Sequence, residues 1–216
     1  MFSIATLTLL LAQYVVASPA LLNPRKSTTH FEIWTIPRLD MHILSPQTNA
    51  PGNPPWSDPP PFQSSIDLDV TLPHHVLDGP HYSDPVTVNC KTEFPNGTFP
   101  GSQDRLYCDP PSSEEVLEFS LKALTREHRR PEMAFELVLT SIYGLDENGY
   151  AQAIWSGSVG VTANDPGKPT GYLKSVGGAP WDGLRCGLKG GMSKKEDLRV
   201  DVARADREEC GFTGEG

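Results

Sequence analysis

The chain alternates apolar and polar residues over several segments, which is the period of a β-strand with one buried face. Residues 66–72 are the clearest case, because four apolar side chains fall on one face and Asp67, Asp69 and Thr71 fall on the other. The same pattern predicts further strands at residues 31–36, 86–90, 133–143, 150–161 and 198–202. The pattern therefore favours a protein built from β-strands.

A turn signal indicates how two of these strands are joined. Asn148-Gly149 has the composition of a two-residue hairpin turn, in which both central residues need a positive φ. We expect it to join residues 133–143 to residues 150–161 as an antiparallel pair. Residues 113–124 and 194–207 fit a helix as well as a strand, because each begins with a capping-box pattern but also alternates. We interpret both as strands.

Proline and glycine, with 21 and 19 residues, are frequent between the predicted strands. Residues 45–61 are rich in proline, which cannot donate a ladder hydrogen bond, so we expect a loop insertion there, or else a ligand for a proline-recognising module. Residues 164–183 form a second turn-rich loop. These features predict an all-β fold, an antiparallel β-barrel or sandwich of many short strands with long Pro/Gly-rich loops.

The N-terminus has the features of a secretory signal peptide. An apolar run at residues 4–12 is too short to span a bilayer, and small residues follow it up to Ala17. We expect cleavage after Ala17, which removes residues 1–17, and a protein that is secreted and extracellular. The mature chain then has a flexible N-terminus (18–28), a single β-rich domain (29–210) and a flexible tail (211–216).

The net charge of −9 narrows the classes of partner. An acidic chain repels phosphate backbones and anionic lipids. No second apolar run is long enough to span a membrane. We therefore expect neither a nucleic-acid nor a membrane partner, and the partner we expect is an extracellular or host protein or a small ligand.

Four cysteines occur, and an even number in a secreted chain indicates two disulfides. Three pairings are possible, and we favour the two local ones, Cys90 with Cys108 and Cys186 with Cys210. A structural zinc site is disfavoured because no Cys-x-x-Cys spacing is present. Asn96 begins the sequon Asn96-Gly97-Thr98 and is predicted to carry a glycan on an exposed loop.

Histidines form the densest group of candidate metal ligands. His74, His75 and His81 lie close together in sequence with two aspartates, and imidazole and carboxylate are suitable ligands for a transition metal. The prolines and glycine between them break any regular face, so we favour a solvated turn and expect no metal and no other cofactor. Metal capture by this loop is kept as an alternative.

No catalytic motif is recognisable. Ser158 lies between glycines, but their spacing differs from that of a nucleophile elbow. Glu136 and other acidic residues offer many carboxylate pairs, yet charge on the outer face of a strand is the usual case. We expect a protein that is not an enzyme, with a secreted hydrolase acting on polysaccharide or ester as the alternative.

Two tryptophans are candidate ligand-binding residues. Trp181 lies in a predicted loop and Trp155 in a predicted strand. An indole ring offers a large apolar face and one donor, so it can stack on a sugar or a flat ligand, or equally close the end of a barrel.

The order of strands and cysteines resembles the fungal secreted family of the major Alternaria allergen. The segments that carry the resemblance are 31–36, 65–70, Val88-Asn89-Cys90, Leu106-Tyr107-Cys108, 117–121, 135–142, 154–161 and Cys186. The resemblance implies a compact antiparallel β-barrel with two intramolecular disulfides, one of them Cys90–Cys108. It also implies a fungal protein that acts as an elicitor, an effector or an allergen-like protein, in a family where some members bind small aromatic compounds.

Three features depart from that family. The chain is longer and carries the insertion at 45–61, Cys210 lies near the C-terminus, and no cysteine precedes Cys90. These departures leave the second disulfide and the oligomeric state open. The sequence as a whole predicts a secreted, non-enzymatic glycoprotein that acts by binding a host protein or a small ligand.

Overall fold

A computed structural model describes residues 30–44, 62–73, 85–109, 115–124, 130–144, 151, 153–177, 183–188 and 197–206. The predicted signal peptide, N-terminal segment, hairpin turn, proline-rich insertion and C-terminal tail lie outside these residues. No helix in the described part of the chain is long and apolar enough to cross a membrane.

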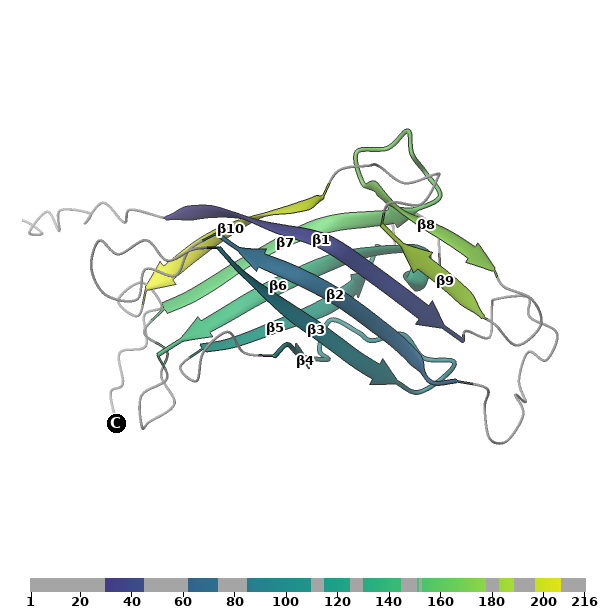
Figure 1. The fold of residues 1–216 in the computed structure, drawn as a ribbon, viewed down its shortest axis with the longest axis horizontal. Coiled ribbons are helices and arrows are strands. Elements are labelled where there is room, and N and C mark those ends of the chain that lie inside the picture. The colour runs from purple at the N-terminus through teal and green to yellow at the C-terminus, as the bar shows by residue number, and fades with distance from the viewer. Residues whose placement is uncertain are drawn as a thin grey trace, which may run out of the picture.

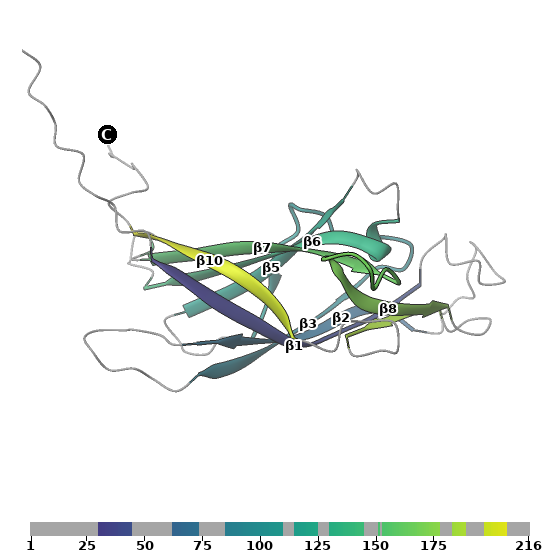
Figure 2. The same ribbon diagram turned by 90° about the horizontal axis from the view of Figure 1, so that it is seen from above.

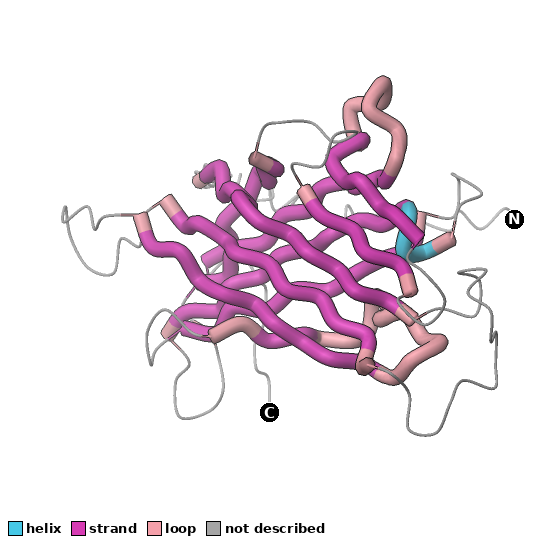
Figure 3. Tube along the Cα trace, turned by 45° about the vertical axis from the view of Figure 1, so that its right-hand side comes forward, coloured by secondary structure: helices cyan, strands magenta, loops and turns pink. Residues whose placement is uncertain are grey.

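The described chain consists almost entirely of strands, which confirms the predicted all-β class (Figure 3). A single turn of 3-10 helix, η2 (Pro131–Met133), precedes β6. The strands are β1 (Phe31–Ile43), β2 (Ser64–Leu72), β3 (Val86–Phe94), β4 (Leu106–Tyr107), β5 (Glu115–Ala123), β6 (Ala134–Tyr143), β7 (Ala153–Ala163), β8 (Gly171–Gly177), β9 (Leu184–Gly187) and β10 (Leu198–Asp206).

All ten described strands belong to one sheet, and nine of them follow the order β3-β2-β1-β9-β8-β7-β6-β5-β4. Neighbouring strands are antiparallel except β7 and β8, which are parallel. β10 pairs with both β1 and β7, so it forms a second bridge between the two halves of the sheet. The sheet therefore curls into a partly closed barrel, with β1, β2 and β3 facing β5, β6 and β7 (Figures 1 and 2).

The two ends of the strand order, β3 and β4, are joined across a seam. Cys90 of β3 forms a disulfide with Cys108, which follows β4 directly, and this confirms the predicted pair. The backbone N–H of Asp109 donates to the carbonyl oxygen of Asn89 at 2.9 Å. The disulfide therefore closes the side of the barrel that continuous strand pairing leaves open.

The inside of the barrel is filled by side chains. Trp34, Phe119 and Phe135 are at most 1% exposed, and they pack with inward-facing aliphatic residues from both halves of the sheet. Burial of this apolar surface is the main favourable contribution to folding. Most polar side chains of the strands therefore lie on the outer face, although a few, such as Glu115 and Ser141, are buried.

A β-bulge in β1 decides which of its residues face outward. Thr35 is opposite Thr71, but the next pair is Arg38 with Asp69, so β1 carries one extra residue around Pro37. Before the bulge Trp34 and Ile36 are buried, whereas after it the buried residues are Leu39, Met41 and Ile43. The extra residue therefore turns Arg38, Asp40 and His42 to the outer surface.

Both ambiguous segments contain strands, β5 and β10, and the helical alternative is wrong for their described residues. The prediction of a loop over residues 164–183 is wrong in part, because β8 lies within it. The side chain of Asn164 holds this strand in place, accepting from the backbone N–H of Ser175 at 2.8 Å and donating to its carbonyl oxygen at 2.7 Å. The side-chain amide of Asn164 thus takes the place of backbone hydrogen bonds from a neighbouring strand. The apolar pattern of the sequence does not predict this arrangement.

Candidate functional site

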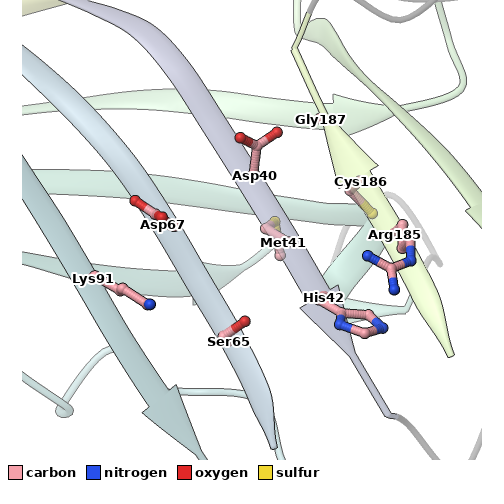
Figure 4. A pocket seen from close by; sticks show the side chains of 9 residues that line it. All are labelled: Asp40, Met41, His42, Ser65, Asp67, Lys91, Arg185, Cys186 and Gly187. Carbon is pink, nitrogen blue, oxygen red and sulfur yellow. The ribbon is translucent and has the colours of Figure 1, made fainter. Parts of the chain in front are cut away.

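An open groove lies on the outer face of the barrel over strands β3, β2, β1 and β9 (Figure 4). Its volume is about 510 Å³. We call it the outer groove, and its lining residues are Asp40, Met41, His42, Ser65, Asp67, Lys91, Arg185, Cys186 and Gly187. Met41 and Cys186 are buried, and the other side chains that line the groove are polar or charged.

Strand register arranges these residues in rows across the sheet. In one row Asp40 lies between Asp67 and Gly187, and Asp67 is opposite Lys91. In the next row His42 lies between Ser65 and Arg185. Directly opposite residues on antiparallel strands share a face, so the sheet itself brings these side chains together.

A charged network forms one end of the groove. Arg38 donates from Nε to Asp69 Oδ2 at 2.7 Å, and from a terminal nitrogen to Asp67 Oδ1 at 2.6 Å. Asn89 donates to both carboxylates at 2.9 Å. These bonds fix the position of Asp67 within the groove.

The network changes the pKa values of Arg38, Asp67 and Asp69. The hydrogen bond from Arg38 holds the pKa of Asp67 and of Asp69 below the ordinary value, and Asn89 contributes in the same direction. Hydrogen bonds to Asp69 and Asp67 in turn raise the pKa of Arg38. Both carboxylates are therefore ionised at neutral pH and act as hydrogen-bond acceptors.

The floor of the groove depends on Gly187. A Cβ atom at this position would come within 2.9 Å of Asp40 Oδ1, closer than such contacts occur in proteins. The carboxylate of Asp40 therefore occupies the space above Gly187, and only glycine leaves room for it there. A larger side chain would displace the flexible end of Asp40 into the groove.

An aromatic stack lies at the other end of the groove. The rings of His42 and Phe62 have centroids 3.7 Å apart and planes inclined by 14°. The stack restrains the imidazole of His42 beside Ser65, and it presents ring surface next to the polar rows.

Of the two predicted ligand-binding tryptophans, the structure describes Trp155, and it does not line the outer groove. Trp155 is half-buried against the core, and the Arg204 guanidinium lies 5.5 Å from its ring centroid. Trp34 is fully buried, and its indole nitrogen donates to Glu32 at 3.1 Å. Trp181 lies outside the described residues.

The candidate metal ligands His74, His75 and His81 also lie outside the described residues. Within the described ranges no group of three or more His, Cys, Asp or Glu residues is arranged to hold a metal ion. Metal capture by the histidine loop stays an untested alternative to the solvated turn that we predict.

The candidate catalytic residues on β6 and β7 are engaged with each other. Ser158 Oγ donates to Glu136 Oε1 at 2.8 Å, and Lys122 Nζ lies 3.5 Å from Glu136 Oε2. This exposed arrangement is typical of cross-strand pairs that stabilise the outer face of a sheet.

Asn96 has a structural part in the turn after β3. It is half-buried, and its Oδ1 accepts from the backbone N–H of Ser64 at 2.9 Å while its Nδ2 donates to the carbonyl of Phe62 at 2.7 Å. Asn96 is thus held by the backbone of residues 62–64, and its glycosylation stays a prediction.

Cys186 is a buried free thiol in the structure, which contradicts the predicted disulfide with Cys210. Its side chain points from β9 toward the interior, between the buried residues Leu184 and Leu188, and it is hydrogen-bonded to Ser175. Burial raises the pKa of the thiol to about 12, so it is protonated at neutral pH. Cys210 lies outside the described residues.

Most of the outer groove has no clear signal in the sequence pattern. Alternation places Asp67 on the polar face of a strand, but Asp40 and His42 follow Pro37, where the predicted strand ends. Arg185 and Gly187 lie on a strand of four residues, too short for alternation to be recognised. Pro37 is the one sequence signal for these residues: if it is interpreted as a bulge, the first strand continues to Asp40 and His42.

No family model, no curated protein and no solved structure matches this chain.

Proposed function

We propose that the protein is a secreted binding protein without enzymatic activity, and that it holds its ligand in the outer groove. The observation that carries this proposal is the contrast between a filled barrel interior and a polar hollow on the outer face. Ligand sites are concave and carry a few polar groups in fixed positions. Here the polar groups are fixed by four paired strands.

The lowered pKa values of Asp67 and Asp69 favour a binding site over an active site for sugar hydrolysis. A glycosidase needs one carboxyl group with a raised pKa as its acid. Asp67 and Asp69 instead have lowered pKa values because Arg38 and Asn89 stabilise their charged forms. Such groups accept hydrogen bonds from a ligand but do not donate a proton at neutral pH.

Export and the family resemblance support a role outside the cell. The signal-peptide pattern and the Cys90–Cys108 disulfide fit an oxidising extracellular environment. The resemblance to the fungal secreted family of the major Alternaria allergen suggests an effector-like or elicitor-like protein that meets a host protein or small ligand.

A binding screen with two matched variants tests the proposal. The mature protein is screened against host-wall glycans, flavonoids and extracellular host proteins. Gly187→Leu fills the floor of the groove, whereas Gly177→Leu places the same side chain on β8, where nothing lies within 4 Å of an added Cβ. We expect a ligand whose binding is lost with Gly187→Leu and kept with Gly177→Leu.

Two results would overturn the proposal. One is a screen in which no ligand binds the wild-type protein. The other is a ligand that binds Gly187→Leu and the wild-type protein equally well, because that ligand would occupy another surface.

One observation favours a hydrolase as the second candidate function. Ser65 and His42 are directly opposite each other on β2 and β1, with Asp40 in the neighbouring row. Incubation with polysaccharide and ester substrates, with Ser65→Ala as the comparison, tests it. Turnover that disappears in Ser65→Ala would replace the binding proposal by an enzymatic one.

A further inference from the structure

We infer that the outer groove takes an acidic oligosaccharide, a chain of sugar units in which carboxylate groups are separated by hydroxyl groups. This inference rests on the proposed binding function and names the class of ligand for the same site. Four features of the groove support it: the cations at its two sides, the hydrogen-bond acceptors in its centre, its position on the face of the sheet, and the aromatic rings at one of its ends.

The cations lie at the two sides of the groove. Lys91 on β3 and Arg185 on β9 are both exposed. Three strand-to-strand steps separate β3 from β9, so their backbones are roughly 14 Å apart at about 4.8 Å per step. A ligand that lies across the strands therefore meets one cation at each end.

The centre of the groove offers acceptors for hydroxyl groups. Asp40 has a side chain that is 60% exposed, and Asp67 and Ser65 lie beside it. Ionised carboxylates accept hydrogen bonds from hydroxyl groups, and these charge-assisted bonds are stronger than neutral ones. The same carboxylates repel a ligand whose negative charges are closely spaced, such as a polyphosphate. The ligand therefore needs neutral hydroxyl groups in its middle and negative charges toward its ends.

The position of the groove disfavours an extended peptide. Peptides that bind sheets add a strand to an exposed edge, where backbone hydrogen bonds give the affinity. β1 and β2, which form the centre of the groove, are paired on both sides, β1 with β2 and β9, and β2 with β1 and β3. A sugar chain does not need backbone pairing, so it fits a groove that lies on the face of the sheet.

The aromatic surface agrees with this class. The stacked rings of His42 and Phe62 form a flat surface next to Ser65. Sugar rings combine apolar faces with hydroxyl edges, so they match a surface with rings and acceptors side by side.

Calorimetric titration of the mature protein tests the inference, with short oligogalacturonides whose inner units are methyl-esterified, so that only the terminal units keep a carboxylate and the middle offers neutral hydroxyl groups. The comparison ligands are neutral galactose oligomers of the same length, polyglutamate and inorganic polyphosphate. We expect the oligogalacturonides to bind most tightly, with an affinity that falls as salt rises. Lys91→Gln and Arg185→Gln should each weaken binding by about tenfold, a typical effect of removing one charged contact.

Arg199→Gln is the matched control, because it removes an exposed cation from β10, outside the groove. It should bind as the wild-type protein does. Lys91→Arg keeps the charge and should retain most of the affinity.

The outcomes separate this inference from the proposed function. Tighter binding of neutral galactose oligomers, polyglutamate or polyphosphate overturns the ligand class, and so does an affinity for oligogalacturonides that Arg199→Gln weakens as much as Lys91→Gln. The proposed function survives either result if another ligand from the wider screen is lost with Gly187→Leu. If no ligand in that screen depends on Gly187, both proposals fail.

Discussion

At the scale of single residues, Arg38 organises the polar surface beside the groove. It ion-pairs with Asp69 and Asp67, and its terminal nitrogen lies 3.4 Å from Asp40. Because these groups are partly exposed, water screens the pairs, and their combined effect on stability is moderate.

Arg38→Gln should lower the free energy of unfolding at neutral pH by ~1–2 kcal/mol, because two carboxylates lose their cation. The folded-state pKa values of Asp67 and Asp69 are lowered, so the stabilisation is present above their unfolded-state pKa of about 3.9. It is lost as the pH falls through the folded-state pKa. Urea unfolding as a function of pH should therefore show a smaller loss of stability in acid for Arg38→Gln than for the wild-type protein.

Arg199→Gln again serves as the comparison, since it removes an arginine without touching the network. An acid dependence that is the same for Arg38→Gln and Arg199→Gln would contradict this role of Arg38.

Cys186 gives a second prediction at the residue scale. Its thiol is buried and protonated, so alkylation by iodoacetamide should fail in the native protein and succeed in denaturant without any reductant. Peptide mass mapping identifies the labelled residue. If Cys186 stays unlabelled in denaturant until a reductant is added, it forms a disulfide and is not a free thiol.

At the scale of elements, the bulge in β1 places the groove. The bulge takes up one extra residue around Pro37, so the inward-facing residues of β1 have even numbers before it and odd numbers after it. Trp34 and Leu39 are therefore both buried. If β1 kept this residue but alternated regularly without a bulge, Leu39, Met41 and Ile43 would face solvent.

Deletion of Pro37 should leave a stable fold with the same sheet, because the shortened strand alternates regularly and keeps Trp34, Ile36, Leu39 and Met41 on the inner face. Pro37→Ala keeps the residue count and the bulge, and it should also fold with the same sheet. Circular dichroism and thermal melting measure both variants. A Pro37 deletion that fails to fold would contradict the assignment of one extra residue to this part of β1.

The bulge also explains how far the sequence could predict these elements. Alternation alone identifies the long strands, and it correctly places Asp67 and Asp69 on the outer face of β2. It cannot place Asp40 or His42, because the alternation changes phase at Pro37. It also misses β8, which is held by the side chain of Asn164 and has few apolar residues of its own.

At the scale of the whole molecule, two connections hold the curled sheet closed. β10 bridges β1 and β7, and the Cys90–Cys108 disulfide joins β3 to the chain that follows β4. The local spacing of these two cysteines made the disulfide predictable. That it lies at the seam was not predictable, because sequence gives no order for strands that are distant along the chain.

Replacing both cysteines by alanine should lower the free energy of unfolding by roughly 3 kcal/mol, the value expected for a loop of this size. In addition to this overall loss of stability, the seam between β3 and β4 should open locally, because the Asp109–Asn89 hydrogen bond crosses it beside the disulfide. Hydrogen exchange should speed up first at β3 and β4, and reduction of the wild-type protein should give the same pattern. Uniform exchange across all strands would argue against a seam.

The central claim is that the ligand binds to the outer groove and does not enter the barrel. Amide chemical-shift mapping of the mature protein with the tightest ligand from the screen tests this claim most directly. We expect the largest shifts at Asp40, Ser65, Lys91 and Gly187, with the same ligand causing no shifts in Gly187→Leu. Shifts centred on Trp34, Phe119 and Phe135, with the outer groove unchanged, would contradict it.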